Sequence, residues 1–168
     1  MGFVLVLGGA RSGKSDRAQR LGVESGRMVT FIATATAGDE EMAERILRHR
    51  SQRPDGWSTV EAPMQLLEAV REAPRQDFLI VDCLTLWVAN ALEAGQSPDA
   101  VVALGGCVAD ELAARDAVVV SNEVGLGIVP TNALARTFRD VLGRVNACFA
   151  ERASKTVLMV AGRSLELR

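Results

Sequence analysis

The sequence predicts an α/β fold in which a mostly parallel sheet carries helices on both faces. Short apolar segments alternate with longer segments of helical periodicity throughout the 168 residues. The short segments are apolar at consecutive positions, which indicates strands that are buried on both faces. No repeat, linker or low-complexity segment interrupts this alternation, so we expect a single domain over residues 1–168. The glycine-rich segment described next predicts that this domain binds a nucleotide.

The first apolar segment, residues 3–7, leads into a glycine-rich segment and then into a helix over 15–21. The glycine-rich segment is Gly8-Gly9-Ala10-Arg11-Ser12-Gly13-Lys14-Ser15 and fits the pattern G-x-x-x-x-G-K-[ST]. Glycines let successive backbone N–H groups point inward and bind phosphate at a helix N-terminus. Lys14 then reaches the β- and γ-phosphates, and the Ser15 hydroxyl binds Mg²⁺. A glycine-rich turn that binds nothing is the alternative, but strand, spacing and helix favour a P-loop that binds a nucleoside triphosphate.

A second strand is expected over residues 28–33, followed by a loop of small residues over 34–38. Three acids open the next helix, 39–52, where the helix dipole favours negative charge. The tripeptide Pro54-Asp55-Gly56 ends that helix, and residues 57–61 form a short extended segment.

The middle of the chain continues the alternation with two further strands and three helices. We expect helices over 63–72, 84–92 and 99–115, and buried strands over 78–82 and 117–121. The strand over 78–82 ends in an acid, Asp82.

The last third contains a glycine-containing loop over 122–130, a long helix and a final strand over 156–160. Five apolar residues at helical spacing predict the helix: Leu134, Phe138, Val141, Val145 and Phe149. Ligands of parallel sheets bind beyond the carboxyl ends of the strands. The candidate loops at that edge are 8–15, 34–38, 82–85 and 122–130.

Two side chains outside the P-loop are candidates for chemistry. Asp82 stands where an acid that holds Mg²⁺ ends a strand in P-loop proteins, although a strand-terminal Asp is also a common turn former. His49 is the only histidine, and Arg45, Arg48, Arg50 and Arg53 surround it. Positive neighbours lower the pKa of an imidazole and leave a neutral nitrogen that can act as a nucleophile. A solvated basic helix end explains the same local residues equally well.

Two further features stay open on the residues alone. Glu61 can accept hydrogen bonds from the N1–H and amino group of guanine, or can be an exposed acid on an edge strand. The loop 122–130 can be a mobile substrate loop or an ordinary long turn.

Composition narrows the class of protein. The formal net charge is −2, and no basic segment indicates binding to nucleic acid or to an anionic membrane. No apolar run approaches the ~20 residues of a membrane helix. Three widely spaced cysteines indicate reduced thiols rather than a disulfide framework or a zinc site. We therefore expect a cytoplasmic protein with no nucleic-acid or membrane partner.

Five segments, taken together and in order, resemble one family. They are G-G-A-R-S-G-K-S, F-I-A-T-A, E-M-A-E-R-I-L-R-H-R-S-Q-R-P, V-D-C-L-T and S-N-E-V-G-L-G-I-V-P. Over essentially the whole chain, the sequence is similar to the bifunctional adenosylcobinamide kinase/adenosylcobinamide-phosphate guanylyltransferases of cobalamin biosynthesis.

This resemblance implies two reactions, a RecA-like P-loop fold and a homotrimer. The first reaction phosphorylates the corrinoid adenosylcobinamide with ATP or GTP. The second transfers GMP from GTP to adenosylcobinamide phosphate through a GMP-histidine intermediate, giving adenosylcobinamide-GDP and pyrophosphate. The resemblance assigns the intermediate to His49. The P-loop motif and the acid that ends its strand predict Mg²⁺ with the nucleotide, with Ser15 and Asp82 as its candidate ligands. The nucleotide contacts that it implies are Gly8, Gly9, Ala10, Arg11, Ser12, Gly13, Lys14, Ser15, Ala33, Thr34, Ala35, Arg50, Ser51, Gln52, Arg53, Glu61 and Asp82.

Two other functions are weighed against this one. A P-loop kinase with one activity, acting on another small alcohol, leaves the arginine-flanked His49 unexplained. A nucleotide-gated binding or assembly module predicts ATP hydrolysis that is independent of any small-molecule acceptor.

Overall fold

The computed structural model describes residues 1–36, 38, 40–51 and 53–167, and at positions 41–43, 45 and 49 it describes the backbone only. A seven-stranded sheet has the strand order β3-β2-β4-β5-β1-β6-β7. All neighbouring strands pair in parallel except β6 and β7, which are antiparallel. The strands are β1 (Gly2–Gly8), β2 (Val29–Ala33), β3 (Ser58–Glu61), β4 (Phe78–Asp82), β5 (Asp116–Val120), β6 (Lys155–Val160) and β7 (Arg163–Leu167).

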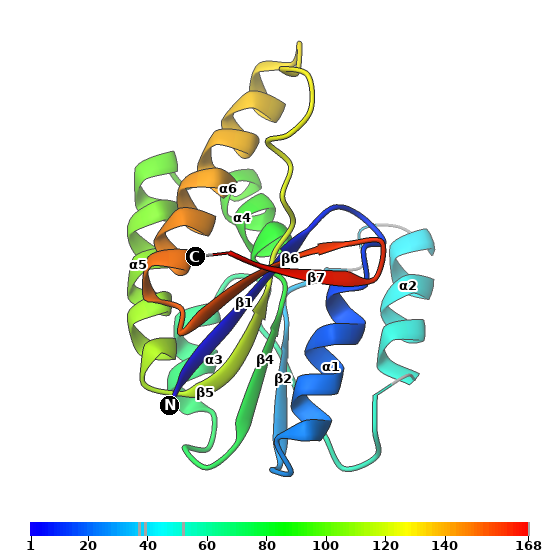
Figure 1. Cartoon of the computed structure of the whole chain (residues 1–168). Coiled ribbons are helices and arrows are strands. Elements are labelled where there is room, and N and C mark those ends of the chain that lie inside the picture. Colours follow the sequence, from blue (N-terminus) through cyan, green and yellow to red (C-terminus); the bar gives the residue numbers. More distant parts are fainter. Residues whose placement is uncertain (37, 39, 52, 168) are drawn as a thin grey trace.

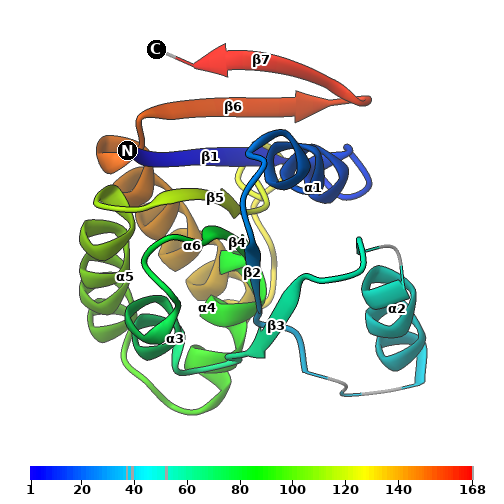
Figure 2. The ribbon, with the colours of Figure 1, turned by 90° about the horizontal axis from the view of Figure 1, so that it is seen from below.

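Helices lie on both faces of this sheet, as Figure 2 shows along the sheet edge. Helix α1 packs on one face, whereas α3, α4, α5 and α6 cover the other, and α2 stands beyond the β3 edge on the α1 side. The helices are α1 (Lys14–Glu24), α2 (Glu40–Ser51), α3 (Leu66–Glu72), α4 (Leu84–Glu93), α5 (Pro98–Ala113) and α6 (Ala133–Arg152). The predicted fold class, a mostly parallel sheet with helices on both faces, is confirmed.

Burial on both faces explains why the strands are apolar at consecutive positions. Along β4, Leu79 and Val81 belong to the large core under α3–α6, whereas Ile80 belongs to the smaller core under α1. All three side chains are fully buried. Each step along a strand reverses the direction of the side chain, so neighbouring positions fill the two cores in turn.

The C-terminal strand corrects the expectation that residues 156–160 form the last strand. Ala161 and Gly162 both have positive φ, 49° and 76°, and turn the chain so that β7 returns antiparallel to β6. Two-residue hairpin turns need positive φ and are usually marked by Asn-Gly or Gly-rich pairs. Alanine is rare in that conformation, so an Ala-Gly pair does not predict a hairpin turn.

Register aligns several predicted site residues at the carboxyl edge of the sheet. Ala33 at the end of β2 pairs with Glu61 on β3 and with Asp82 on β4, and Asp82 pairs with Val120 on β5. The P-loop begins on β1, the strand on the other side of β5. Strands that are consecutive in this row thus bring residues 8–15, 33, 61 and 82 to one edge.

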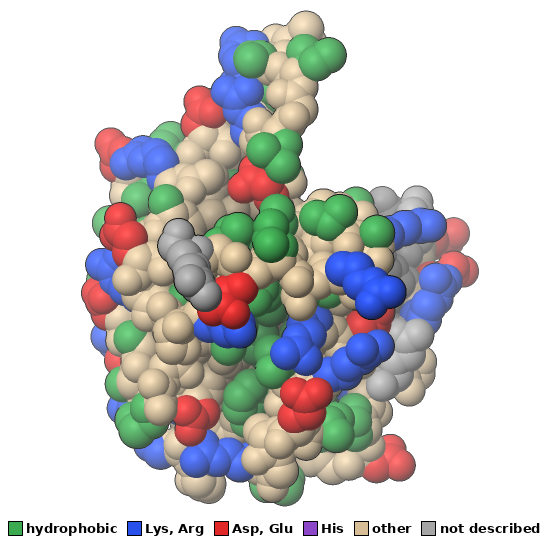
Figure 3. Space-filling view, viewed as in Figure 1, with side chains coloured by type: hydrophobic (Ala, Val, Ile, Leu, Met, Phe, Trp, Pro, Cys, Tyr) green, Lys and Arg blue, Asp and Glu red, His purple; other side chains and the backbone are tan. Residues whose placement is uncertain are grey.

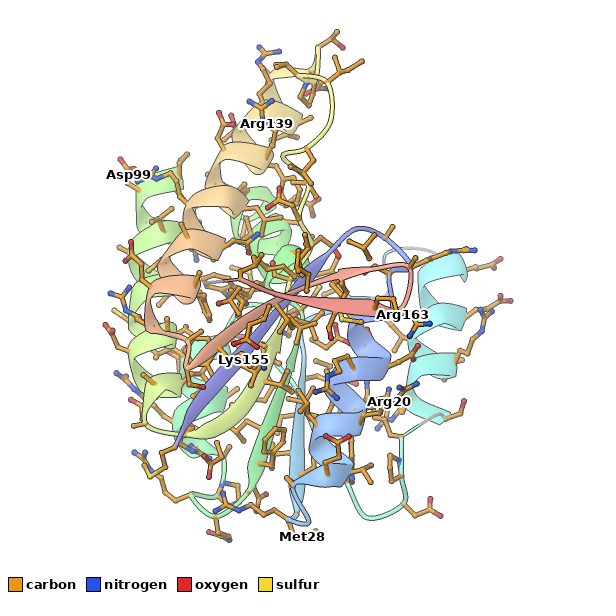
Figure 4. The ribbon with its side chains drawn as sticks, viewed as in Figure 1. Arg20, Met28, Asp99, Arg139, Lys155 and Arg163 are labelled. Carbon is orange, nitrogen blue, oxygen red and sulfur yellow. The ribbon has the colours of Figure 1, made fainter. Side chains whose placement is uncertain are left out.

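The segment that joins β5 to α6, together with the first turns of α6, projects beyond the rest of the molecule (Figure 1). We call residues 124–134 the projecting segment. Arg139, labelled in Figure 4, lies on the part of α6 that leaves the body. Within the described residues, the helices are all too short or too polar to cross a membrane.

Candidate functional site

The P-loop connects the buried strand β1 to helix α1, and its glycines allow the backbone conformation that it adopts. Gly13 precedes the helix with φ 94°, and the Lys14 ammonium donates a hydrogen bond to the Gly9 carbonyl at 2.6 Å. A β-carbon at Gly8 would lie 2.5 Å from the Met159 carbonyl oxygen, so only glycine fits there. The hydroxyl of Ser12 is buried and has no hydrogen-bond partner among the described residues. The loop therefore presents an amide nest, a lysine and a buried hydroxyl to an incoming anion.

The C-terminal hairpin supports this loop from the side. The Gly162 N–H donates to the Ser12 carbonyl at 3.0 Å. A β-carbon at Gly13 would lie 3.4 Å from the Gly162 α-carbon, so the two backbones are in close contact.

Ser15 and Asp82 meet directly, although 67 positions separate them. The Ser15 hydroxyl donates to Asp82 Oδ2 at 3.1 Å. Mg²⁺ usually binds through one or two carboxylates together with phosphate oxygens and water. A hydroxyl and a carboxylate beside a phosphate-binding loop fit that ion. No cluster of three or more His, Cys, Asp or Glu able to hold a metal alone occurs among the described residues.

Thr34 fastens the end of β2 to the end of β4. Its fully buried hydroxyl donates to the Cys83 carbonyl at 2.7 Å and accepts from the Cys83 N–H at 2.8 Å. The Asn90 amide on α4 donates to the carbonyls of Thr34 and Pro63, at 2.9 and 3.0 Å. These bonds hold the loops after β2, β3 and β4 in a fixed relation.

A second set of polar contacts fixes the loop after β5. The Asn122 N–H donates to the Thr85 hydroxyl at 2.8 Å, and the buried Asn146 amide on α6 donates to the Asn122 carbonyl at 3.0 Å. Ser121 donates through its hydroxyl to the Asn146 amide oxygen at 2.7 Å. Sequence reasoning missed Asn90, Thr85 and Asn146. The available signal was a polar residue within the apolar face of a helix.

Arg53 lies against the middle of β2 rather than in solvent. Its guanidinium carbon is 3.6 Å from the centre of the Phe31 ring, and Nη1 donates to the Thr59 hydroxyl at 2.9 Å. Burial lowers the pKa of Arg53, and the charge of Asp82 opposes that shift. Arg50 and Arg53 line a hollow of about 280 Å³ with residues 54–57 and Thr59. That hollow lies beside the start of β3 and not at the P-loop.

Glu61 is exposed, and its carboxylate lies 3.8 Å from the Arg50 guanidinium. Arg50 and Ser51 are the last two residues of α2, and both are exposed. The backbone of His49 lies in the same helix, whereas its side chain lies outside the described residues. Gln52 also lies outside them. The Arg50–Glu61 pair brings the C-terminal end of α2 next to the row of strand ends.

The structure thus brings one group of the predicted residues together around the strand ends and places a second group farther out, toward the edge strand β3. Residues 8–15, Ala33, Thr34 and Asp82 surround the ends of β1, β2 and β4. Arg50, Arg53 and Glu61 lie toward the outer strand β3. In Figure 3, basic side chains gather over α1 and α2.

Comparisons with known proteins agree on family and fold. Residues 4–167 match the family model described as cobinamide kinase / cobinamide phosphate guanyltransferase. The chain is 46% identical over 168 residues to a bifunctional adenosylcobalamin biosynthesis protein, CobP, of Pseudomonas aeruginosa, covering 98% of this chain and 96% of the relative. It is 38% identical over 181 residues to the corresponding protein CobU of Escherichia coli, covering 99% of each.

Solved structures with the same arrangement have other activities and show the fold alone. The RadB recombinase superposes with a TM-score of 0.56 at 14% identity, covering 94% of this chain and 73% of that one. An ATPase of a type III secretion system superposes with a TM-score of 0.53 at 11% identity, covering 94% and 51%. Both likenesses are consistent with the RecA-like arrangement that the family resemblance implies.

The thiol beside Asp82 gives a pH-dependent test of this geometry. Burial, and then the neighbouring Asp82 carboxylate, raise the pKa of Cys83 to about 11. At pH 9 only about one such thiol in a hundred is the reactive thiolate. We expect iodoacetamide to label the exposed Cys107 and to spare Cys83 between pH 7 and 9, as read by peptide mass spectrometry. Urea-unfolded protein, in which both react, is the control. Equal labelling of both cysteines in folded protein at pH 8 would contradict the partly buried environment of Cys83.

Proposed function

This chain belongs to the cobinamide kinase / cobinamide phosphate guanyltransferase family, and we propose how its residues divide the two reactions. The family's enzymes are bifunctional and act in adenosylcobalamin biosynthesis. The observation that carries the proposal is the Ser15–Asp82 hydrogen bond beside the P-loop, because it joins the two parts of a nucleotide site.

In the kinase reaction, the proposed substrates are adenosylcobinamide and ATP or GTP. The amide nest of residues 8–15 binds the β- and γ-phosphates, and Lys14 moves from the Gly9 carbonyl to the phosphate oxygens. Ser15 and Asp82 would hold Mg²⁺, which supplies charge neutralisation at the phosphates. Phosphoryl transfer depends mainly on positioning and electrostatic stabilisation, which these groups provide.

In the guanylyl transfer, the proposed nucleophile is His49. Arg48 and Arg50 flank it in the sequence, and positive neighbours favour the neutral imidazole that can attack the α-phosphate of GTP. The position of α2 supports this assignment, because Arg50 reaches Glu61 in the row that also contains Asp82. We assign guanine recognition to Glu61 and the remaining nucleotide contacts to Ala33, Thr34, Ala35, Arg50, Ser51, Gln52 and Arg53.

We also propose that copies of the chain associate as the homotrimer that the resemblance implies. The projecting segment supports association because it exposes apolar side chains away from the body (Figure 3). Leu126 is 85% exposed, Ile128 98% and Leu134 64%. Apolar side chains gathered on a projection are typical of a protein contact. A neighbouring copy is the proposed occupant.

The experiment that tests the proposed function distinguishes the α-phosphorus of GTP from its γ-phosphorus. If His49 attacks the α-phosphate, α-labelled GTP should leave label on the protein and γ-labelled GTP should not. The adduct should be acid-labile, since protonation of a phosphoramidate nitrogen creates a good leaving group. His49→Ala should lose both the covalent label and guanylyl transfer, and should keep much more of its kinase activity. Mass analysis of the corrinoid product measures each reaction.

Lys14→Ala is the control, because it should lose both reactions and the label together. Label that persists in His49→Ala, or wild-type label that resists acid, would exclude His49 as the site of the intermediate.

A second prediction concerns recognition of the guanine base of GTP. Glu61→Gln replaces a carboxylate by a group that accepts only through one oxygen and would place an amide against guanine donors. We expect the KM for GTP in guanylyl transfer to rise roughly tenfold or more, with a much smaller change for ATP in the kinase reaction. Equal changes for the two nucleotides would assign Glu61 to another role.

A third prediction concerns assembly. Sedimentation velocity should find three copies per particle for the wild type, and Ile128→Asp should shift the population to smaller species because it places a charge in the apolar contact. Val23→Asp, on α1, is the matched control at an apolar residue that is 60% exposed. A wild type that sediments as a monomer, or an Ile128→Asp variant that assembles normally, would remove the projecting segment from the interface.

A further inference from the structure

The two reactions make different demands on a proton acceptor. The kinase acceptor is an alcohol, whose O–H proton must leave as the oxygen attacks phosphorus. The guanylyl acceptor is a phosphate, which is already anionic and needs no base. A carboxylate that serves only as a base should therefore matter for one reaction alone.

Three described carboxylates end, or closely follow, strands at the carboxyl edge. Asp82 accepts a hydrogen bond from the Ser15 hydroxyl and is proposed to hold Mg²⁺. Glu61, on the outer strand β3, forms an ion pair with Arg50 of α2. The third, Glu123, follows β5. Its position differs from that of the other two, because β5 lies between the strand that carries the P-loop and the strand that carries Asp82.

Backbone contacts place Glu123 beside the first residue of the P-loop. The Ser121 N–H donates to the Val6 carbonyl at 3.0 Å, and the Glu123 N–H donates to the Gly8 carbonyl at 3.1 Å. On its other side, Asn122 is joined to Thr85, three positions after Asp82. The backbone of Glu123 thus lies between the start of the P-loop and the helix that follows Asp82.

The side chain of Glu123 is also held in place. Its Oε1 accepts from the Gly125 N–H at 2.6 Å, and the side chain is partly buried. Asn146 on α6 fixes the preceding residues through Ser121 and Asn122. A carboxylate has about four lone-pair positions, so one bond to Gly125 leaves it able to accept a substrate hydroxyl. A catalytic group supported in this way is pre-organised.

We propose that Glu123 is the general base of the kinase reaction, an inference that rests on the two-reaction function above. The O–H bond of the corrinoid alcohol breaks, and its proton passes to the Glu123 carboxylate. The oxygen forms a bond to the γ-phosphorus, and the bond from that phosphorus to the β–γ bridging oxygen breaks. The electron pair leaves with the nucleoside diphosphate, and Glu123 then releases the proton to water.

The test is Glu123→Gln, which keeps an oxygen to accept from the Gly125 N–H and removes the base. We expect kinase kcat to fall by about 10²–10³-fold, with the KM for ATP changed less than about threefold. Guanylyl transfer to supplied adenosylcobinamide phosphate should keep its wild-type rate. Glu123→Asp, which keeps a carboxylate, should be faster than Glu123→Gln.

Glu72→Gln is the matched control, since this exposed acid ends α3 at the opposite edge of the sheet. Near-wild-type kinase kcat in Glu123→Gln would overturn the proposal. An equal loss of both reactions would overturn it as well, because it would indicate a structural role. A failure of the proposed function has a different signature, namely a wild type that forms no corrinoid phosphate or no protein-bound GMP.

Discussion

The hydrogen bond from the Ser15 hydroxyl to the Asp82 carboxylate depends on the order of three strands. Ser15 follows β1 and Asp82 ends β4, and these strands are not neighbours, because β5 lies between them. The bond therefore forms only when β5 has paired with both. That pairing requires strands buried on both faces, which in turn requires helices on both sides. The apolar runs of the sequence and the polar site at their ends are two consequences of one topology.

The same topology lets side chains approach the phosphate site from two directions, from beyond the outer strand and from the central strands. Helix α2, which carries His49, stands beyond the outer strands β2 and β3, whereas Glu123 follows the central strand β5. On our proposals, the nucleophile for the α-phosphorus comes from the outer side and the base for the γ-phosphate reaction from the central side. A kinase with a single activity needs no histidine on the outer side, and a nucleotide-gated binding module needs neither group. The family assignment agrees with a site that carries out two reactions.

Sequence reasoning predicted the parts of the site that local chemistry determines. The P-loop, the strand that ends in Asp82 and the alternation of elements all follow from patterns of a few residues, and the structure places them as expected. Strand β7 was missed because its turn begins with an alanine at positive φ, which no local pattern marks. Asn90 and Asn146 were missed because their partners are carbonyls of residues far away in the sequence, which only the topology identifies. The role of His49 came from family resemblance, and it stays a prediction.

The contact between Gly162 and Ser12 bears on when the site can form during protein synthesis. A ribosome makes the P-loop, residues 8–15, long before it makes Gly162, whose N–H supports that loop. Strand β1 can pair only after β5 and β6, its two neighbours in the sheet, have been made. Contacts between residues so far apart in sequence form late and slowly. A nascent chain therefore carries the complete phosphate-binding motif long before it can hold that motif in shape. A message that ends within β6 would yield a protein with every P-loop residue but without the Gly162 contact that supports them.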